Sequence, residues 1–292
     1  MRLSISNLAW DRTEDSAIAR LLANHRINAI DLVPGKYFPD PLRTSPQAIG
    51  QVRQWWDGHG IDIIGMQALL FGTDGLNVFG PESSRQALLT HLTAICHIGA
   101  SLGARRLVFG SPKNRDRSHL DDEAGVQIMA LDFFRRAGDI AYDHGVIFCL
   151  EPAPPCYGGN FLTTHQQAAG FVAALDHPAV RLQLDTGALA LNHESIDSLL
   201  PAHQALVGHI HASEPQLRPL GDPGVANQDP AADHTGAARV IAAHLPGYPV
   251  TLEMLATAHE PHAQAIDRAL TRARAAYRSA APQGPDAPAA RP

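Results

Sequence analysis

The sequence has few of the features that identify several large protein classes. It contains no run of 18 apolar residues, so it predicts no membrane-spanning helix and no membrane partner. Its three cysteines, Cys96, Cys149 and Cys156, have no zinc-finger spacing, and an odd number argues against a disulfide framework. So little cysteine favours a reducing cytoplasm. The N-terminal apolar stretch alternates and is too short for a signal peptide, so it predicts a strand.

Basic residues are also scarce. The chain has 23 Lys and Arg against 29 Asp and Glu, a net charge of −6, and a pI of about 6.2. This acidic balance argues against nucleic acid as the main partner. The chain also lacks the Gly-x-Gly-x-x-Gly and Walker loops that bind nucleotides after a strand.

What the chain does contain is a regular alternation of two apolar patterns. Strand-like segments fall at 3–10, 29–33, 61–67, 106–109, 146–151, 180–185, 206–211 and 249–253. Helical patterns fall between and after them, at 14–25, 46–56, 83–102, 122–144, 164–175, 195–203, 236–244 and 261–277. Strict alternation predicts a parallel sheet, and eight units of this size fit an α/β, (β/α)8 TIM barrel of one domain. We expect the barrel to span residues 1–279, followed by a disordered Pro/Ala-rich tail at 280–292.

Four of the predicted strands carry a metal-binding type of residue near their carboxyl ends. Glu151 follows VIFCL, Asp185 follows VRLQL and Glu253 follows PVTL, while His211 lies within LVGHIHASE. Each acidic residue could simply cap the turn that follows it. However, an unpaired charge at the end of a buried strand costs several kcal/mol, so a carboxylate there needs a reason.

The alternation of strand side chains indicates where these four residues point. Successive side chains face opposite sides of a sheet, so each of the four shares a face with the residue two positions earlier. That face is mixed and polar, and it suits the barrel interior: Cys149, Gln183, His209 and Thr251. The other face is apolar and suits the helices: Leu150, Leu184, Ile210 and Leu252. The four residues should therefore converge at the carboxyl end of the barrel, where active sites of this fold lie.

On these motifs the chain resembles the xylose-isomerase-like TIM barrel superfamily, in particular its sugar phosphate isomerase/epimerase branch. The resemblance covers nearly the whole chain and rests on LEP, LDTG, HIHASEP and LEM, with MQALLFG and VFGSPKNRDR in support. It implies that Glu151, Asp185, His211 and Glu253 bind one divalent cation. Their oxygen and nitrogen donors suit Mn²⁺, Mg²⁺ or Co²⁺, with Zn²⁺ as a further candidate.

The resemblance also implies an activity. The expected enzyme is a cytoplasmic isomerase or epimerase acting on a sugar, a sugar phosphate or a related polyol. Glu151 and Glu253 would take and return a proton through a metal-stabilised enediolate. The chain departs from ketose epimerases at Ala188, where they often carry a substrate-binding histidine, and at Tyr157 and Asn160, where an acidic residue often follows the first glutamate.

These departures leave alternatives open. A cyclitol (inosose-type) dehydratase or lyase would use the same metal and the same first proton abstraction. An endonuclease IV-like metallohydrolase is less favoured, because the chain lacks the basic surface that nucleic acid requires. A metal-binding barrel without catalysis would leave two carboxylates with no task beyond charge balance. The sequence does not decide whether the chain forms a homo-oligomer.

Further candidates follow other predicted strands. Lys113 and Arg115 could clamp a phosphate or carboxylate, or belong to a solvated basic loop. The other candidate substrate-binding residues, each of which could instead pack or cap, are Asn7, Trp10, Gln67, Tyr157, Asn160, Glu214, Arg218 and His234.

Overall fold

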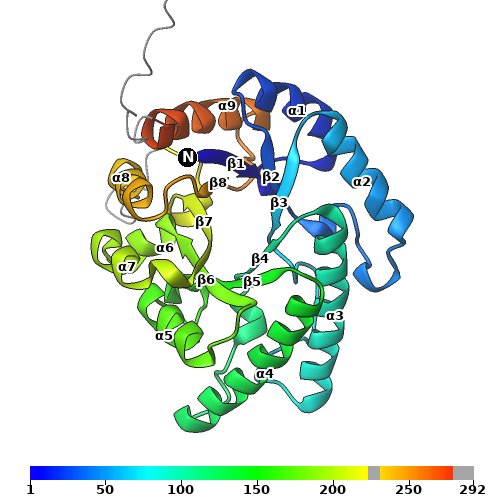
Figure 1. Cartoon of the computed structure of the whole chain (residues 1–292), viewed down its shortest axis with the longest axis vertical. Coiled ribbons are helices and arrows are strands. Elements are labelled where there is room, and N and C mark those ends of the chain that lie inside the picture. The colour runs from blue at the N-terminus through cyan, green and yellow to red at the C-terminus, as the bar shows by residue number, and fades with distance from the viewer. Residues whose placement is uncertain (223–230, 279–292) are drawn as a thin grey trace, which may run out of the picture.

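Eight parallel strands close into a barrel in chain order, and helices surround it (Figure 1). The computed structural model describes residues 1–222 and 231–278, so the tail predicted for 280–292 lies outside the described residues. The strands are β1 (Arg2–Ser6), β2 (Ala29–Leu32), β3 (Asp62–Met66), β4 (Arg106–Phe109), β5 (Ile147–Leu150), β6 (Val180–Asp185), β7 (Val207–Ser213) and β8 (Pro249–Glu253). Pairing of β8 with β1 closes the sheet, so the prediction of a single TIM barrel is confirmed.

The described α-helices form the outer ring. They are α1 (Asp15–Asn24), α2 (Pro46–Gly58), α3 (Glu82–Leu102), α4 (Glu123–Asp143), α5 (His165–Leu175), α6 (Thr186–Leu191), α7 (Ile196–His203), α8 (His234–His244) and α9 (His262–Ala273). Within residues 1–222 and 231–278, none of the helices combines the length and hydropathy needed to cross a bilayer.

Two predicted boundaries are wrong by two residues or more where a side chain caps the backbone, and one helix was missed for the same reason. The first strand stops at Ser6 and not at Trp10, because the Ser6 hydroxyl accepts the Leu8 N–H and begins a 3₁₀ turn. Helix α8 begins at His234 and not at Gly236, because the Asp233 carboxylate caps its first turn. Helix α6 was not predicted at all; it begins where Asp185 Oδ1 accepts the Ala188 N–H at 2.6 Å.

The two faces of the strands differ as the alternation predicts. Leu150, Leu184 and Ile210 are fully buried in the apolar core between sheet and helices. The polar side chains point into the barrel and contact one another there. Asp31 of β2 contacts His209 of β7, although these two strands are not neighbours in the sheet.

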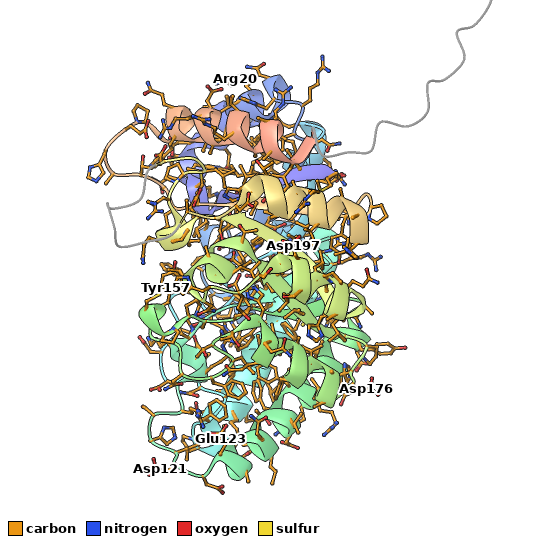
Figure 2. The ribbon with its side chains drawn as sticks, turned by 90° about the vertical axis from the view of Figure 1, so that its left-hand side faces the viewer. Arg20, Asp121, Glu123, Tyr157, Asp176 and Asp197 are labelled. Carbon is orange, nitrogen blue, oxygen red and sulfur yellow. The ribbon has the colours of Figure 1, made fainter. Side chains whose placement is uncertain are left out.

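Loops at the carboxyl ends of the strands form one end of the barrel. Figure 2 shows the molecule from the side, with Tyr157 and Glu123, which follow β5 and β4, at that end. Asp176, which precedes β6, lies toward the opposite end. Any site built from strand ends therefore opens among the loops that include Tyr157.

Candidate metal centre

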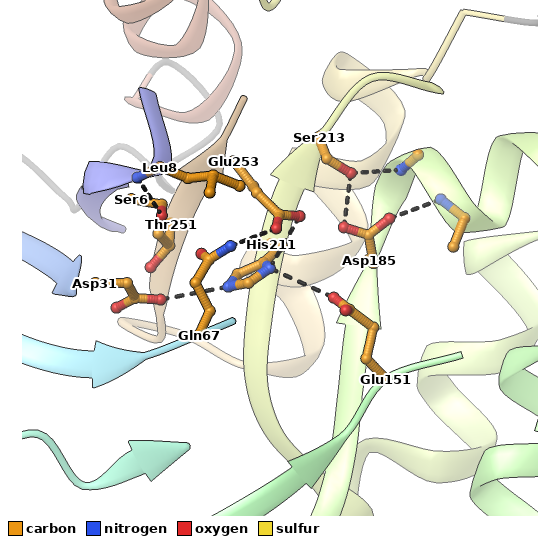
Figure 3. Close-up of polar contacts among 12 residues, drawn as sticks. Ser6, Leu8, Asp31, Gln67, Glu151, Asp185, His211, Ser213, Thr251 and Glu253 are labelled. Carbon is orange, nitrogen blue, oxygen red and sulfur yellow. Dashed lines mark hydrogen bonds and ion pairs between the residues drawn. The ribbon is translucent and has the colours of Figure 1, made fainter. Parts of the chain in front are cut away.

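Strands β5 to β8 bring four side chains to one point at the carboxyl end of the barrel (Figure 3). One ligand atom from each of Glu151, Asp185, His211 and Glu253 lies within 4.8 Å of all the others. His211 Nδ1 is 3.5 Å from Glu151 Oε1 and 3.2 Å from Glu253 Oε2. The sequence expected these four residues to converge, and the structure brings them together.

These residues fit a divalent cation. Glu151 Oε1 and His211 Nδ1 are both buried, and neither has a hydrogen-bond partner in the described part of the chain. Buried polar atoms without partners are costly, and three carboxylates buried together repel one another. One divalent ion would give the buried atoms a partner and would reduce the repulsion between the carboxylates. Carboxylate oxygens and an imidazole nitrogen are donors that Mn²⁺, Mg²⁺, Co²⁺ and Zn²⁺ accept.

The pKa values of the cluster show how strongly burial and mutual charge act on it. Burial raises the pKa of Glu151 to about 7 against the opposing effect of His211, and the charge of Glu253 adds to the rise. Burial and the same Glu253 charge also raise the pKa of Asp185. Burial lowers the pKa of His211, but the surrounding carboxylates outweigh it and hold that pKa well above its usual value. Without a cation the cluster therefore retains protons that a cation would displace.

This predicts a pH dependence of metal stabilisation. The pKa of Glu151 is higher in the folded chain than in the unfolded chain, so metal-free stability falls as the pH rises through about 7. A bound cation removes this penalty. The rise in melting temperature on adding Mn²⁺ should thus be larger at about pH 8 than at about pH 6. Calorimetry at both values tests this, and a larger rise at the lower pH would contradict it.

Asp31, which the sequence analysis missed, contacts the nitrogen of His211 that faces away from the other ligands. Asp31 Oδ2 lies 3.3 Å from His211 Nε2 and 2.6 Å from His209 Nε2, and all three side chains are fully buried. Because Nε2 of His211 donates to Asp31, Nδ1 remains as the nitrogen that faces Glu151 and Glu253. Gly65 on β3 makes room, since a Cβ there would lie 2.6 Å from Asp31 Oδ1. A carboxylate inside the apolar strand AIDL was the sequence signal for it.

Replacing Asp31 with Asn should weaken metal binding while keeping the side-chain shape. The amide carries no charge to favour the Nε2–H form of His211, so affinity for Mn²⁺ should fall about 10–100-fold. Titration calorimetry of the metal measures this without any substrate. Asp267→Asn is the matched control, because Asp267 pairs with the nearly buried His25 at 2.7 Å, away from the four ligands. Equal affinities in the two variants would refute the role of Asp31.

Two of the three carboxylates are positioned by a hydrogen bond. Gln67 Nε2 donates to Glu253 Oε1 at 2.5 Å, and Ser213 Oγ donates to Asp185 Oδ2 at 2.6 Å. Gly110 leaves the space that Glu151 occupies, since a Cβ there would clash with Glu151 Oε2. Glu253 and Asp185 are therefore fixed before any ligand arrives, which is the pre-organisation that a metal centre needs.

Two cavities meet at Glu151 and Glu253, which line both of them. One, here the β3–β4 cavity, has a volume of about 390 Å³ and lies among residues 67–74, 108–111, 113 and 114. The other, here the β5–β7 cavity, has a volume of about 300 Å³ and is lined mainly by residues that follow β5, β6 and β7. A ligand held at the cluster can therefore extend in two directions.

Four of the predicted substrate-binding residues line these cavities. Gln67 and Lys113 line the β3–β4 cavity, and Tyr157 and Glu214 line the β5–β7 cavity. Their contact with substrate stays a prediction. The residues that line neither cavity are Asn7, Trp10, Arg115, Asn160, Arg218 and His234.

The residues of that second group make contacts within the protein. Trp10 is fully buried, and its Nε1 donates to Asp15 Oδ1 at 2.8 Å. Asn7 Oδ1 accepts the Val33 N–H, and Asn160 Nδ2 donates to Asp116. Arg115 is buried beneath the loop after β4 and donates to the carbonyls of Gly110 and Ser111. His234 Nε2 lies 3.3 Å from Glu214 Oε1, behind the cavity wall. Arg218 is half-buried just after β7.

Known proteins share this arrangement of strands. The family described as Xylose isomerase-like TIM barrel matches residues 19–276. A D-psicose 3-epimerase of Ruminiclostridium cellulolyticum is 28% identical over 93 residues, which are 32% of this chain and only 31% of that protein. A D-psicose 3-epimerase of Clostridium cellulolyticum H10, solved with D-tagatose, has a TM-score of 0.77 at 18% identity, covering 95% of this chain and 99% of that chain.

The IOLI protein, solved with a bound zinc atom, has a TM-score of 0.68 at 16% identity, covering 96% of this chain and 98% of its own. At such identities the two solved structures show the fold alone. The family match, by contrast, spans most of the chain and includes all four converging residues. This chain belongs to the xylose isomerase-like TIM barrel family, and its structural neighbours include sugar epimerases.

Proposed function

We propose that the protein is a divalent-metal-dependent epimerase or isomerase that moves a proton at a carbon next to the carbonyl of a sugar or related polyol. The observation that carries this proposal is the position of two glutamates at one centre. Figure 3 shows Glu253 and Glu151 beside the same edge of the His211 ring, where both approach Nδ1, and they belong to β8 and to the end of β5. Both carboxylates would also be ligands of the cation, and their two oxygens near one nitrogen place two possible proton carriers at the same point.

A bound divalent ion would supply Lewis acidity, polarising a hydroxyl and a neighbouring carbonyl so that the C–H between them becomes acidic. The side chains of this protein would then move the proton. Without a cation, burial raises the pKa of Glu151 to about 7. A bound cation would lower that pKa, so Glu151 would be a carboxylate able to accept a proton at neutral pH. Glu253 has Oε1 held by Gln67, which leaves Oε2 facing the centre.

The route of the proton decides the outcome. Removal by one glutamate and return by the other on the opposite face inverts one carbon, which is epimerisation. Return of the proton to the neighbouring carbon gives isomerisation. The relatives named D-psicose 3-epimerase, one of them solved with D-tagatose, support a ketose as the substrate class.

Turnover in D₂O tests the proposal. The Mn²⁺-loaded protein is incubated with D-psicose, D-tagatose and D-fructose, and products are followed by NMR. We expect an epimer or isomer carrying deuterium at one carbon, because an abstracted proton exchanges with solvent before it returns. Product without solvent deuterium, together with transfer of a substrate deuterium to the adjacent carbon, would indicate a hydride shift and refute the roles of both glutamates. A product that has lost water would indicate a dehydratase.

A further inference from the structure

We propose that the natural substrate is an uncharged sugar with an apolar or aromatic substituent beside its carbonyl, and that this substituent lies in the β5–β7 cavity. The proposal rests on the proposed function and specifies the substrate class of the same site. It is carried by the side chains that line the two cavities, by the polar groups that remain available in them and by the charge around the cluster.

The β5–β7 cavity offers mainly apolar walls next to the four ligands. Ala153, Pro154, Ala188, Leu217 and Leu255 contribute to its lining. Ala188 is small and lies one helical turn from Asp185, so space remains directly beside the cluster. Leu255 is one of the few large apolar side chains on the surface, with 46% of its area exposed. A ligand group covering Leu255 would remove apolar area from water, which favours binding.

Apart from the four converging residues and the exposed Gln216, the polar side chains of the same cavity are engaged within the protein. Ser213 Oγ donates to Asp185 Oδ2 at 2.6 Å. Glu214 Oε2 accepts the Ala232 N–H at 3.0 Å. The Tyr157 hydroxyl accepts a backbone N–H at 2.7 Å and keeps one proton to donate. A substituent rich in hydroxyls would find few partners here, whereas an apolar ring needs none.

The β3–β4 cavity has polar side chains that are open to a ligand. Lys113 and Asp74 line it, and their side chains are 67% and 91% exposed. Sugar hydroxyls could hydrogen-bond to them without a change in their charge. The two cavities thus define an orientation, with the carbonyl at the four ligands, the hydroxylated chain in the β3–β4 cavity and the substituent in the β5–β7 cavity.

The charge of the site disfavours a phosphate. Three carboxylates and one divalent ion leave one net negative charge at the centre. Among the described residues that line the two cavities, Lys113 is the one cation, and its exposed ammonium already lies 2.6 Å from Asp74 Oδ1. Arg115 is buried and lines neither cavity. An anionic group would meet a like charge with little compensation.

Three matched probes test this on the full-length, Mn²⁺-loaded protein. D-Fructose, 1-O-benzyl-D-fructose and D-fructose 1-phosphate share the carbonyl and the hydroxyl beside it, and differ only in the group on the other side. Titration calorimetry should give a Kd about tenfold or more lower for the benzyl ether than for D-fructose, and no gain for the phosphate. Tightest binding of the phosphate, or no preference for the benzyl ether, would overturn the proposal.

Two surface variants locate the substituent. Leu255→Ala should abolish most of the benzyl preference, and Phe71→Ala should leave it unchanged, because Phe71 lines the other cavity. Both side chains are exposed, at 46% and 80%, so folding is not at risk. The reverse pattern would place the substituent in the β3–β4 cavity and refute this assignment. If ketoses take up deuterium from the solvent but the benzyl ether does not bind more tightly, this inference alone is refuted. If the benzyl ether binds more tightly but no ketose takes up deuterium, the proposed function is refuted.

Discussion

His211→Ala is expected to remove the divalent cation and the activity together. His211 provides the one nitrogen of the four-residue cluster, and its Nδ1 lies within 3.5 Å of both glutamates. Alanine leaves three carboxylates with no neutral ligand among them. The cation loses one donor atom, and the carboxylates still repel one another. Loss of a residue that only supports a ligand lowers metal affinity about 10–100-fold. Loss of the ligand His211 itself should lower it further. Elemental analysis of the purified variant gives the metal content per chain.

His25→Ala is the matched control for this experiment. His25 is also nearly buried and also pairs with an aspartate, Asp267, at 2.7 Å, but it lies at the end of α1. Its loss should lower stability and leave about one cation per chain. Full metal occupancy in His211→Ala would show that the cluster is not the metal site, and a loss of metal in both variants would trace the effect to folding.

Glu151→Gln and Glu253→Gln should each reduce kcat by about 10²–10⁴ while leaving much of the metal bound. Glutamine keeps the length of the side chain and one oxygen for the cation, but it cannot accept a proton. Metal affinity should therefore fall less than in His211→Ala. Single-turnover kinetics in D₂O would separate the two roles. A variant that still exchanges the proton of one epimer identifies the glutamate serving that face.

Glu14→Gln is a suitable comparison for the two glutamate variants. Glu14 is held by His262 at 2.5 Å near the start of α1 and lines neither cavity. Its replacement should leave kcat unchanged. If Glu151→Gln and Glu253→Gln both retained full turnover, neither carboxylate would be a proton carrier, and the proposed chemistry would fail even if the metal site were correct.

The sequence by itself determined the barrel and the direction of its key side chains. Strand alternation depends only on neighbouring residues, so the parity of Glu151, Asp185 and Glu253 could be read without knowing what they contact. The alternation of strands with helices is equally local, and it was sufficient for the closed parallel sheet. The prediction failed where a side chain caps the backbone: the first strand ends at Ser6, and helix α6 after Asp185 was missed. One hydrogen bond at each place outweighs the strand or loop pattern.

Only the tertiary structure decided which distant side chains meet. Asp31 and His211 are 180 residues apart, and their contact requires the barrel to close and the register to shift after Ile30 and after Leu182. The same closure buried Trp10 in the core and left Gln67 beside Glu253. A strand pattern tells which face a residue is on, whereas partners across a barrel depend on the summed register of all eight strands, which no local pattern contains.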